Sequence, residues 1–404
     1  MRKRTRRGER TSGLALPSRS RVRHEAAAEE ESMRIRTTLA VMIAGAFIFV
    51  ACQAGPTAAQ WKIGVVTDVG SVNDKNFNEF TFVGSKAGAQ AIGAAEPPVT
   101  VPKDASEYEP ALQAYIDQGF NIIVSTGFNL AAPTVQKAHD NTDTWFIGVD
   151  QGGSTLCITE EGLPDTTFAC KGNANAATLL PKYVAISYQE DQPGYLAGMV
   201  AASVSETGEI GAIGGITLCG PCIRYIHGYK LGAQSINPNI VVKVAWVTES
   251  DFVKAFYDPD GGKIFGQQFL AQNPNVDVLF QVAGNTGNGV LDAACEADIY
   301  AVGVDVDQAL SYPSAAKCIV VSAEKKLALS VEELIKGIAA GTVTGGDNHW
   351  DATRDGIGIS PFHEFESLIS AELQTKLDEA LAAMKAGTLT TCPEKCSDIT
   401  GIES

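Results

Sequence analysis

Three acidic residues lie at positions in the sequence where they could bind a ligand. Asp68, Asp150 and Asp305 each follow a run of β-branched and other apolar residues and have glycines nearby in the sequence. Such runs indicate buried parallel strands, and the carboxyl ends of parallel strands converge on one cleft. A single acid there is more often a solvated loop residue or a helix cap, but three favour a ligand site. A pair of carboxylates could accept hydrogen bonds from two vicinal hydroxyl groups, as in sugar recognition.

The first of these acids opens a segment rich in polar and aromatic side chains. After Asp68 the chain turns at Gly70, and Asn73 and Asp74 supply side-chain oxygens of the kind that cap a helix. Phe77 follows at the start of the predicted helix. We therefore expect polar groups and an aromatic ring at the carboxyl end of the first strand.

The rest of the chain predicts alternating strands and helices. Expected strands are 121–126, 144–149, 183–188, 209–213, 240–247, 277–282, 300–305 and 318–322. Expected helices are 107–118, 131–140, 192–205, 262–272, 287–297 and 324–340. This alternation predicts an α/β fold with doubly wound parallel sheets and right-handed crossovers.

Two such series suggest two similar lobes, divided near residues 187–189. We predict that the N-terminal lobe contains 61–187 plus 309–350, and the C-terminal lobe 188–308 plus 351–387. The remaining segment, 388–404, is a Cys-containing tail. About 340 residues suit two domains better than one.

The N-terminal region predicts export. Residues 1–32 are Arg-rich and then Glu-rich, lack apolar periodicity, and are expected to be a disordered upstream extension. Residues 33–51 combine arginines with a short apolar run, which is typical of a signal peptide and too short for a confident membrane span.

The end of this signal resembles the lipobox of bacterial lipoproteins, although Phe49 departs from the usual aliphatic residue. Cys52 would then carry the lipid, and 52–60 would be a tether between the membrane and the fold. Cleavage after Ala59, which discards Cys52, is the alternative.

The charge balance excludes some partners. Eleven of the 31 basic residues but five of the 47 acidic residues lie in 1–51, so the remainder has a formal charge of −22. Such a surface disfavours nucleic acid and anionic lipid, which attract basic patches.

Eight further cysteines fall in close pairs, which in an exported chain suggests disulfides. Neighbour pairing gives Cys157–Cys170, Cys219–Cys222, Cys295–Cys318 and Cys392–Cys396. The motif Cys-Gly-Pro-Cys at 219–222 also matches thioredoxin-like redox centres, but a structural staple is favoured because the surrounding chain does not match that smaller fold. A zinc site is disfavoured, because no second C-x-x-C or histidine pair stands at the required spacing.

Three motifs in order along the chain carry a family resemblance. They are Thr67-Asp68-x-Gly70-x-x-x-Asp74-Lys75-x-Phe77-Asn78, Gln281-Val-Ala-Gly284-x-Thr286-Gly287-x-Gly289 and Gly303-Val-Asp305-x-Asp307-Gln308. Together they resemble the basic membrane protein family, the purine-nucleoside-binding lipoproteins of bacterial ABC importers. The resemblance covers 61–385 and implies a type I periplasmic-binding-protein fold, with two lobes joined by a three-crossover hinge. The segments 157–170, 248–255 and 388–404 fit it less well.

The resemblance also implies contacts with a nucleobase. Phe77 and Phe256 correspond to aromatic residues that stack on the base, and each stacked face is worth about 1–3 kcal/mol. Asp68 and Asp150 correspond to polar contacts at the base end, and Asn78 to a supporting neighbour. Either phenylalanine could instead be a core residue. If the insertion 248–255 shifts the alignment, Trp246 replaces Phe256.

Sugar contacts are implied in the same way. Asp305 corresponds to the carboxylate that accepts from the ribose 2′- and 3′-hydroxyls, and Lys325 to a sugar-binding lysine, with Lys326 as the alternative after a one-residue slip. Gly284 and Gly303 would let the backbone approach the ligand. The glycine-rich segment 284–289 lacks the lysine and Ser/Thr of a phosphate loop.

These features predict an exported, lipid-anchored, monomeric binding protein that passes purine nucleosides to an ABC permease and ATPase. No cofactor, metal or catalytic residue is expected. A binder of a free sugar or signalling furanose is the alternative, because related folds recognise sugars with the same residue types. A nucleoside hydrolase is disfavoured, because neither a clustered metal motif nor an activated nucleophile is evident.

Overall fold

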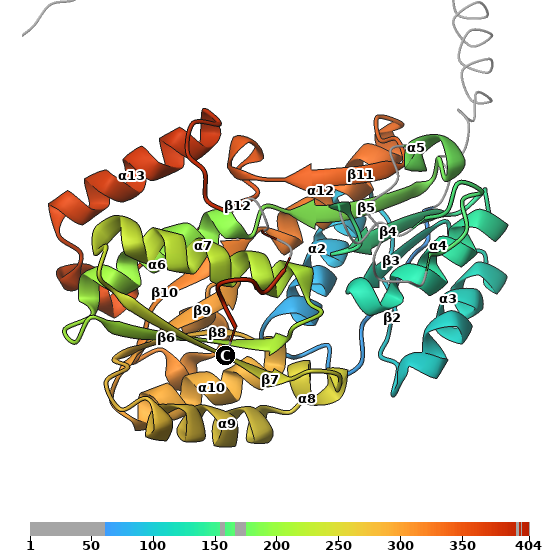
Figure 1. Ribbon diagram of the computed structural model, residues 1–404. Coiled ribbons are helices and arrows are strands. Elements are labelled where there is room, and N and C mark those ends of the chain that lie inside the picture. Colours follow the sequence, from blue (N-terminus) through green and yellow to red (C-terminus); the bar gives the residue numbers. More distant parts are fainter. Residues whose placement is uncertain (1–60, 154–157, 166–174, 393–395, 397, 404) are drawn as a thin grey trace, which may run out of the picture. The chain divides into compact units, whose positions relative to one another are not determined.

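The computed structural model describes residues 61–153, 158–165, 175–392, 396 and 398–403. Two six-stranded sheets form its framework (Figure 1). The first sheet has the order β11-β5-β4-β3-β1-β2, and all its strand pairs are parallel. Its strands are β1 (Ile63–Val66), β2 (Val99–Thr100), β3 (Ile122–Thr126), β4 (Trp145–Val149), β5 (Tyr183–Tyr188) and β11 (Gly346–Trp350). The long apolar strands are buried on both faces, as parallel sheets covered by helices require.

The second sheet repeats this arrangement. Its order, β12-β10-β9-β8-β6-β7, is the same winding with different strands, and only the edge strand β12 is antiparallel to its neighbour among the described pairs. The strands are β6 (Glu209–Ile216), β7 (Val241–Thr248), β8 (Val278–Val282), β9 (Tyr300–Asp305), β10 (Ile319–Lys325) and β12 (Ile357–Ile359). The predicted α/β fold with two doubly wound sheets is therefore confirmed.

Helices cover both faces of each sheet. They are α2 (Phe77–Ala91), α3 (Tyr108–Asp117), α4 (Ala131–Asp140), α5 (Ala176–Leu179), α6 (Asp191–Val204), α7 (Gly220–Ile236), α8 (Phe252–Phe256), α9 (Pro259–Gln272), α10 (Gly284–Glu296), α11 (Gln308–Ser311), α12 (Leu327–Ala340) and α13 (Ala371–Lys385). Within the part of the chain that the structure describes, no helix is both long and apolar enough to span a membrane.

Glycines allow the helices α6 and α7 to pack closely. Gly194 and Gly198 of α6 face α7, where a Cβ would lie 2.3 Å from Tyr225 O and 2.0 Å from Tyr229 O. Gly228 of α7 is equally tight against the α6 backbone. Because the two backbones touch at these glycines, α7 is held at a fixed place, with its N-terminus at the ligand cavity described below.

The chain passes between the sheets three times: after β5, after β10 and after β11. The second passage corrects the predicted lobe boundary at residue 309. Strand β10, Ile319–Lys325, pairs with β9 and β12 in the second sheet, and only α12 returns to pack on α2 of the first. The sequence could not reveal this, because an apolar run has the same pattern in either sheet and pairing is a long-range property. The strands β2, β11 and β12 were also missed, since they are short or polar edge strands.

Candidate ligand-binding cleft

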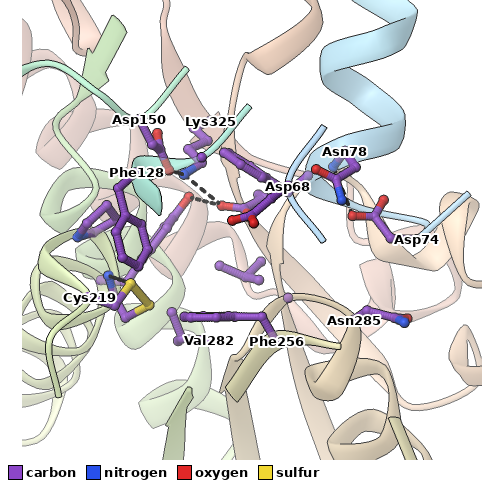
Figure 2. Close-up of a pocket in the computed structure, with 18 of the residues that line it drawn as sticks. Asp68, Asp74, Asn78, Phe128, Asp150, Cys219, Phe256, Val282, Asn285 and Lys325 are labelled. Carbon is purple, nitrogen blue, oxygen red and sulfur yellow. Dashed lines mark hydrogen bonds and ion pairs between the residues drawn. A yellow bond between two sulfur atoms is a disulfide. The ribbon is translucent and has the colours of Figure 1, made fainter. Parts of the chain in front are cut away.

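A cavity lies where the carboxyl ends of both sheets meet (Figure 2). Eight of the nine predicted ligand residues line it: Asp68, Phe77, Asn78, Asp150, Phe256, Gly284, Asp305 and Lys325. They come from the ends of β1, β4, β9 and β10 and from α2, α8 and α10. Strands separated by most of the chain thus bring their terminal residues together, as doubly wound sheets require.

Gly303 is the exception, and its expected role is corrected. It lies within β9, where a Cβ would meet Ser322 Oγ at 2.4 Å and Gln308 Cβ at 3.0 Å. Its lack of a side chain therefore allows β9 to pack against β10 and α11. Of the residues left as alternatives, Lys325 and Phe256 line the cavity, and neither Lys326 nor Trp246 is among its lining residues.

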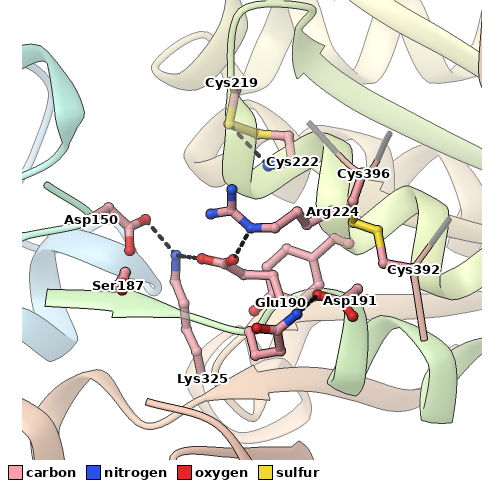
Figure 3. A network of polar contacts seen from close by, with 12 residues as sticks. Asp150, Ser187, Glu190, Asp191, Cys219, Cys222, Arg224, Lys325, Cys392 and Cys396 are labelled. Atoms are coloured by element: carbon pink, nitrogen blue, oxygen red, sulfur yellow. Dashed lines mark hydrogen bonds and ion pairs between the residues drawn. A yellow bond between two sulfur atoms is a disulfide. The ribbon is translucent and has the colours of Figure 1, made fainter. Parts of the chain in front are cut away.

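One set of buried charges, the lysine group, centres on Lys325 (Figure 3). Its ammonium nitrogen lies 2.5 Å from Asp150 Oδ2, 3.4 Å from Asp305 Oδ1 and 4.0 Å from Glu190 Oε1. Arg224 Nε donates to Glu190 Oε2 at 2.6 Å. The lysine group therefore holds three carboxylates and two cations. Asp150, which the resemblance places at the base end, is paired with Lys325, the lysine assigned to the sugar.

Burial shapes the protonation of the lysine group. Loss of solvent raises the pKa of Asp150 to about 6, although the Lys325 charge opposes this shift. Loss of solvent also raises the pKa of Asp305, again against the pull of Lys325. Burial disfavours the charged form of Lys325 itself, but the neighbouring carboxylates raise its pKa above the usual lysine value. Lys325 therefore remains a cation.

The two aspartates of this group have strained backbones. Asp150 has φ = 58° and Asp305 has φ = 67°, in the left-handed region that non-glycine residues seldom adopt. Asp150 follows the last residue of β4 and Asp305 is the last residue of β9, and the two strands have matching places in the two sheets. Strain of this kind is concentrated at functional sites, where the surrounding fold enforces it.

A second set, the tyrosine group, surrounds Asp68 with uncharged donors: Tyr108, Asn129 and Tyr257. The Tyr108 hydroxyl donates to Asp68 Oδ1, and Asn129 Nδ2 donates to Oδ2 at 3.2 Å. The Tyr257 hydroxyl, from the second lobe, also interacts with this carboxylate and lowers its pKa. Burial raises the pKa of Asp68, and these hydrogen bonds partly offset the shift.

The start of α2 is built around Asp74. Its carboxylate accepts the backbone N–H groups of Asn76, Asn78 and Glu79 at 2.8–3.0 Å. Of the two candidate caps in the sequence, Asn73 and Asp74, it is therefore Asp74 that caps the helix. Burial raises its pKa to about 6 despite these bonds. The cap fixes Asn78, whose buried Oδ1 has no hydrogen-bond partner among the described residues and which lines the cavity.

Aromatic rings form other parts of the wall. Phe77 lies beside Lys325, whose Nζ is 4.8 Å from the ring centroid. Phe256 packs edge-to-face on Phe128, with centroids 6.3 Å apart. The sequence did not predict that Phe128 and Tyr225 line the cavity, because both lie outside the three motifs. For Glu190 and Arg224 no local signal marks a buried ion pair.

The structure pairs Cys219 with Cys222, Cys295 with Cys318 and Cys392 with Cys396. The predicted pair Cys157–Cys170 lies outside the described residues. Cys219 and Cys222 line the cavity. Among the described groups, Asp191, Cys392 and Cys396 lie close enough to share a metal ion, but the two sulfurs are already bonded to each other.

Two doubly wound sheets, three crossings and a cavity between the strand ends define a substrate-binding protein of the periplasmic type. The chain belongs to the Bmp family, described as ABC transporter substrate-binding protein PnrA-like, whose profile matches residues 62–387. This confirms the resemblance drawn from the three motifs.

Individual relatives agree with this assignment. Basic membrane protein D of Borreliella burgdorferi is 29% identical over 325 residues, covering 78% of this chain and 83% of that protein. The ABC transporter nucleoside-binding protein BmpA of Lactococcus lactis is 25% identical over 293 residues, covering 68% and 74%. An ABC solute-binding protein of Aeropyrum pernix has a similar fold, with a TM-score of 0.68 at 20% identity over 83% of this chain and 94% of that one.

Proposed function

We propose that this protein captures purine nucleosides between its two lobes and delivers them to an ABC importer. The observation that carries the proposal is that Phe77 and Phe256 line the same cavity as the carboxylates of Asp68 and Asp305. Phenyl rings favour a planar base, and buried carboxylates favour a ligand rich in hydroxyl and N–H donors. A related protein carries the name nucleoside-binding protein.

The ribose is proposed to bind at the lysine group. Asp305 accepts from Tyr225 and Lys325 through Oδ1, so its second oxygen can accept from a vicinal diol. Lys325 has three donor hydrogens and can donate one to a ribose oxygen while it retains Asp150. The base is proposed to lie between Phe77 and Phe256, with its edge toward Asn78, whose Oδ1 is free to accept an N–H.

Calorimetry tests this proposal with inosine, guanosine, adenosine, uridine, 2′-deoxyinosine and free ribose. We expect the purine ribonucleosides to bind most tightly and ribose alone to bind weakly, because it lacks the stacked base. Tighter binding of ribose than of any nucleoside would support the sugar-binding alternative. Chromatography of the ligand after incubation should recover intact nucleoside, and release of free base would reveal a hydrolase.

The location of the protein is part of the same proposal. We infer that Cys52 is the mature N-terminus, carries lipid, and anchors a monomer at the extracytoplasmic face of the membrane. Two acyl chains suffice for stable attachment, since each buried methylene contributes about 0.8 kcal/mol. Mass spectrometry of the N-terminal peptide checks this inference. An unmodified chain beginning at Gln60 would show cleavage after Ala59 instead.

A further inference from the structure

The disulfide Cys219–Cys222 occupies an unusual place for a structural staple. Both cysteines line the ligand cavity, and Figure 2 shows Cys219 near Phe128 at its wall. The two residues are otherwise covered, with exposed fractions of 3% and 5%. The cavity wall is therefore the side from which we expect a reagent to reach these sulfur atoms.

The local structure stabilises negative charge on one of the two sulfurs. Cys219 is the N-cap of the 17-residue helix α7, and its Sγ accepts the backbone N–H of Cys222 at 3.2 Å. A helix N-terminus and an N–H donor both favour a thiolate. A Cβ on Gly220 would lie 3.3 Å from Arg224 Nη1, so a guanidinium group borders the same turn. Figure 3 shows Arg224 beside this disulfide.

Cys295–Cys318 provides the contrast within the same lobe. The carbonyl oxygen of Ala315 lies 3.4 Å from Cys295 Sγ and 3.2 Å from Cys318 Sγ. A carbonyl oxygen repels a thiolate, so reduction there gains no electrostatic stabilisation. Neither residue is among those that line the ligand cavity.

We propose that Cys219–Cys222 is an exchangeable redox disulfide that opens into the ligand cavity and reacts with dithiols when the cavity is empty. A dithiol thiolate attacks Cys222 Sγ, and the sulfur–sulfur bond breaks to release Cys219 as the stabilised thiolate. The second thiol of the reagent then attacks the mixed disulfide. Cys222 leaves as a thiol, the reagent becomes a cyclic disulfide, and two electrons pass from the reagent to the protein.

Ligand occupancy controls this exchange, a consequence that rests on the proposed function. A nucleoside in the cavity occupies the space through which the dithiol must pass. By linkage, if the ligand binds the oxidised form better than the reduced form, reduction weakens ligand binding by the same factor. The disulfide then connects the redox state of the compartment to substrate capture.

The first test compares the two disulfides within one protein. The ligand-free protein is treated with dithiothreitol, quenched with iodoacetamide at intervals, and analysed by peptide mass spectrometry. We expect Cys219 and Cys222 to be alkylated at least about tenfold faster than Cys295 and Cys318, because the leaving thiolate is stabilised. Equal rates, or faster reduction of Cys295–Cys318, would overturn the exchange site.

Saturating inosine is then added to the same assay. We expect reduction of Cys219–Cys222 to slow about tenfold or more relative to Cys295–Cys318, which corrects for general stabilisation by ligand. Unchanged relative rates in a protein that calorimetry shows to bind inosine would refute the gating. If no nucleoside binds, the proposed function fails, while the ligand-free comparison still decides whether the exchange site exists.

Single variants test which sulfur carries the charge. We expect Cys219 in Cys222→Ser to react with iodoacetamide at pH 7 several-fold faster than Cys222 in Cys219→Ser, because the stabilising N–H points to residue 219. The opposite order would contradict the proposed geometry. Circular dichroism checks that both variants fold. Should either fail to fold, the comparison of the two disulfides in the unmodified protein remains decisive.

Discussion

The lysine group and the tyrosine group hold buried carboxylates at the same cavity by different means. In the lysine group, Asp150 and Asp305 share the cation of Lys325. In the tyrosine group, Asp68 is surrounded by hydroxyl and amide donors without a net charge. A buried charge needs either a countercharge or several hydrogen bonds, and this cavity uses both solutions.

Each group also joins the two lobes. Lys325, at the end of β10 in the second sheet, pairs with Asp150 at the end of β4 in the first. Tyr257 follows α8 of the second lobe, its ring packs against Gly70 of the first lobe, and its hydroxyl interacts with Asp68 beyond β1. Removal of one partner of a buried ion pair costs more than removal of one neutral donor, because a charge is then left uncompensated. The lysine group should therefore dominate stability, and the tyrosine group should adjust closure.

Replacement of Lys325 gives the largest expected effect. Lys325→Met leaves three buried carboxylates with Arg224 as their remaining cation, so we expect the free energy of unfolding to fall by about 3–5 kcal/mol. Chemical denaturation measures this change. Lys336→Met is the control, because Lys336 pairs with Glu333 at the exposed surface and its loss should cost less than about 1 kcal/mol. Equal losses in the two variants would contradict the central role of Lys325.

Replacement of Asp305 tests the proposed ribose contact. Asp305→Asn should weaken ribonucleoside binding about 10- to 100-fold, because hydrogen bonds to a charged acceptor contribute about 1.5–3 kcal/mol. Binding of 2′,3′-dideoxyinosine should change much less, since it lacks both hydroxyls. Isothermal titration with the two ligands measures the difference. If the variant weakened both ligands equally, Asp305 would serve closure instead of ribose recognition.

The two groups also differ in how far the sequence predicted them. Asp68, Asp150 and Asp305 were found because each ends an apolar strand, and the strand ends of a doubly wound sheet must converge. Tyr108 and Tyr257 were missed, since each reaches Asp68 from a remote segment and neither has a distinctive local pattern. Glu190 and Arg224 were missed for the same reason. Local patterns thus predicted the strand ends, while their partners depend on long-range packing.

The fold shows the same division between local and long-range information. Strands with continuous apolar runs, such as β3, β4 and β9, were predicted within one residue of their bounds. Strand β11 contains Asp347, Asn348 and His349, which do not read as a strand, and it forms only because β5 offers a parallel edge. The lobe boundary at 309 was wrong because the sequence does not specify the sheet that β10 joins.

Replacement of Phe256, an aromatic residue of the cavity wall, gives the next largest expected effect on ligand binding. Phe256→Ala should weaken all purine nucleosides by about 1–3 kcal/mol without changing their order, because stacking depends little on the base. Phe252→Ala is the matched control: Phe252 packs on Phe128, with centroids 5.8 Å apart, but is not among the cavity-lining residues. Calorimetry with inosine and adenosine measures both variants. A changed preference between the two bases in Phe256→Ala would mean that the ring does more than stack.

Asp74 predicts a pH dependence. Its pKa is raised by burial from 3.8 to about 6, so between about pH 4 and 6 the folded protein binds more protons than the unfolded chain. Ionisation of Asp74 therefore lowers the free energy of unfolding as pH rises through this window. Asp74→Asn should reduce this fall by about 1–2 kcal/mol, measured by denaturation at pH 4 and pH 6.5.

Asp104→Asn is the control for this pH effect. Asp104 also caps a helical turn, but it is exposed, and hydrogen bonding from Ser106 lowers its pKa. A carboxyl group with a lowered pKa adds stability above its unfolded pKa and loses it as pH falls. Asp104→Asn should therefore not reduce the fall in the free energy of unfolding that the unmodified protein shows as pH rises from about 4 to 6. If both variants changed the pH profile in the same direction, burial of Asp74 would not be the cause.

The smallest expected effect separates two hydroxyl groups that bind one carboxylate. Tyr108, of the first lobe, donates its hydroxyl to Asp68, and the hydroxyl of Tyr257, of the second lobe, interacts with the same carboxylate. Loss of either hydroxyl should lower the free energy of unfolding by about 1 kcal/mol. Of these two hydroxyls, only that of Tyr257 comes from the lobe opposite Asp68. Tyr257→Phe should therefore also favour the open form and weaken nucleoside binding about fivefold, an energy of about 1 kcal/mol. Tyr108→Phe should leave the equilibrium between open and closed forms unchanged, and small-angle scattering without ligand measures that equilibrium. Equal opening in the two variants would mean that Asp68 is a packing feature of the first lobe and that closure depends on the lysine group.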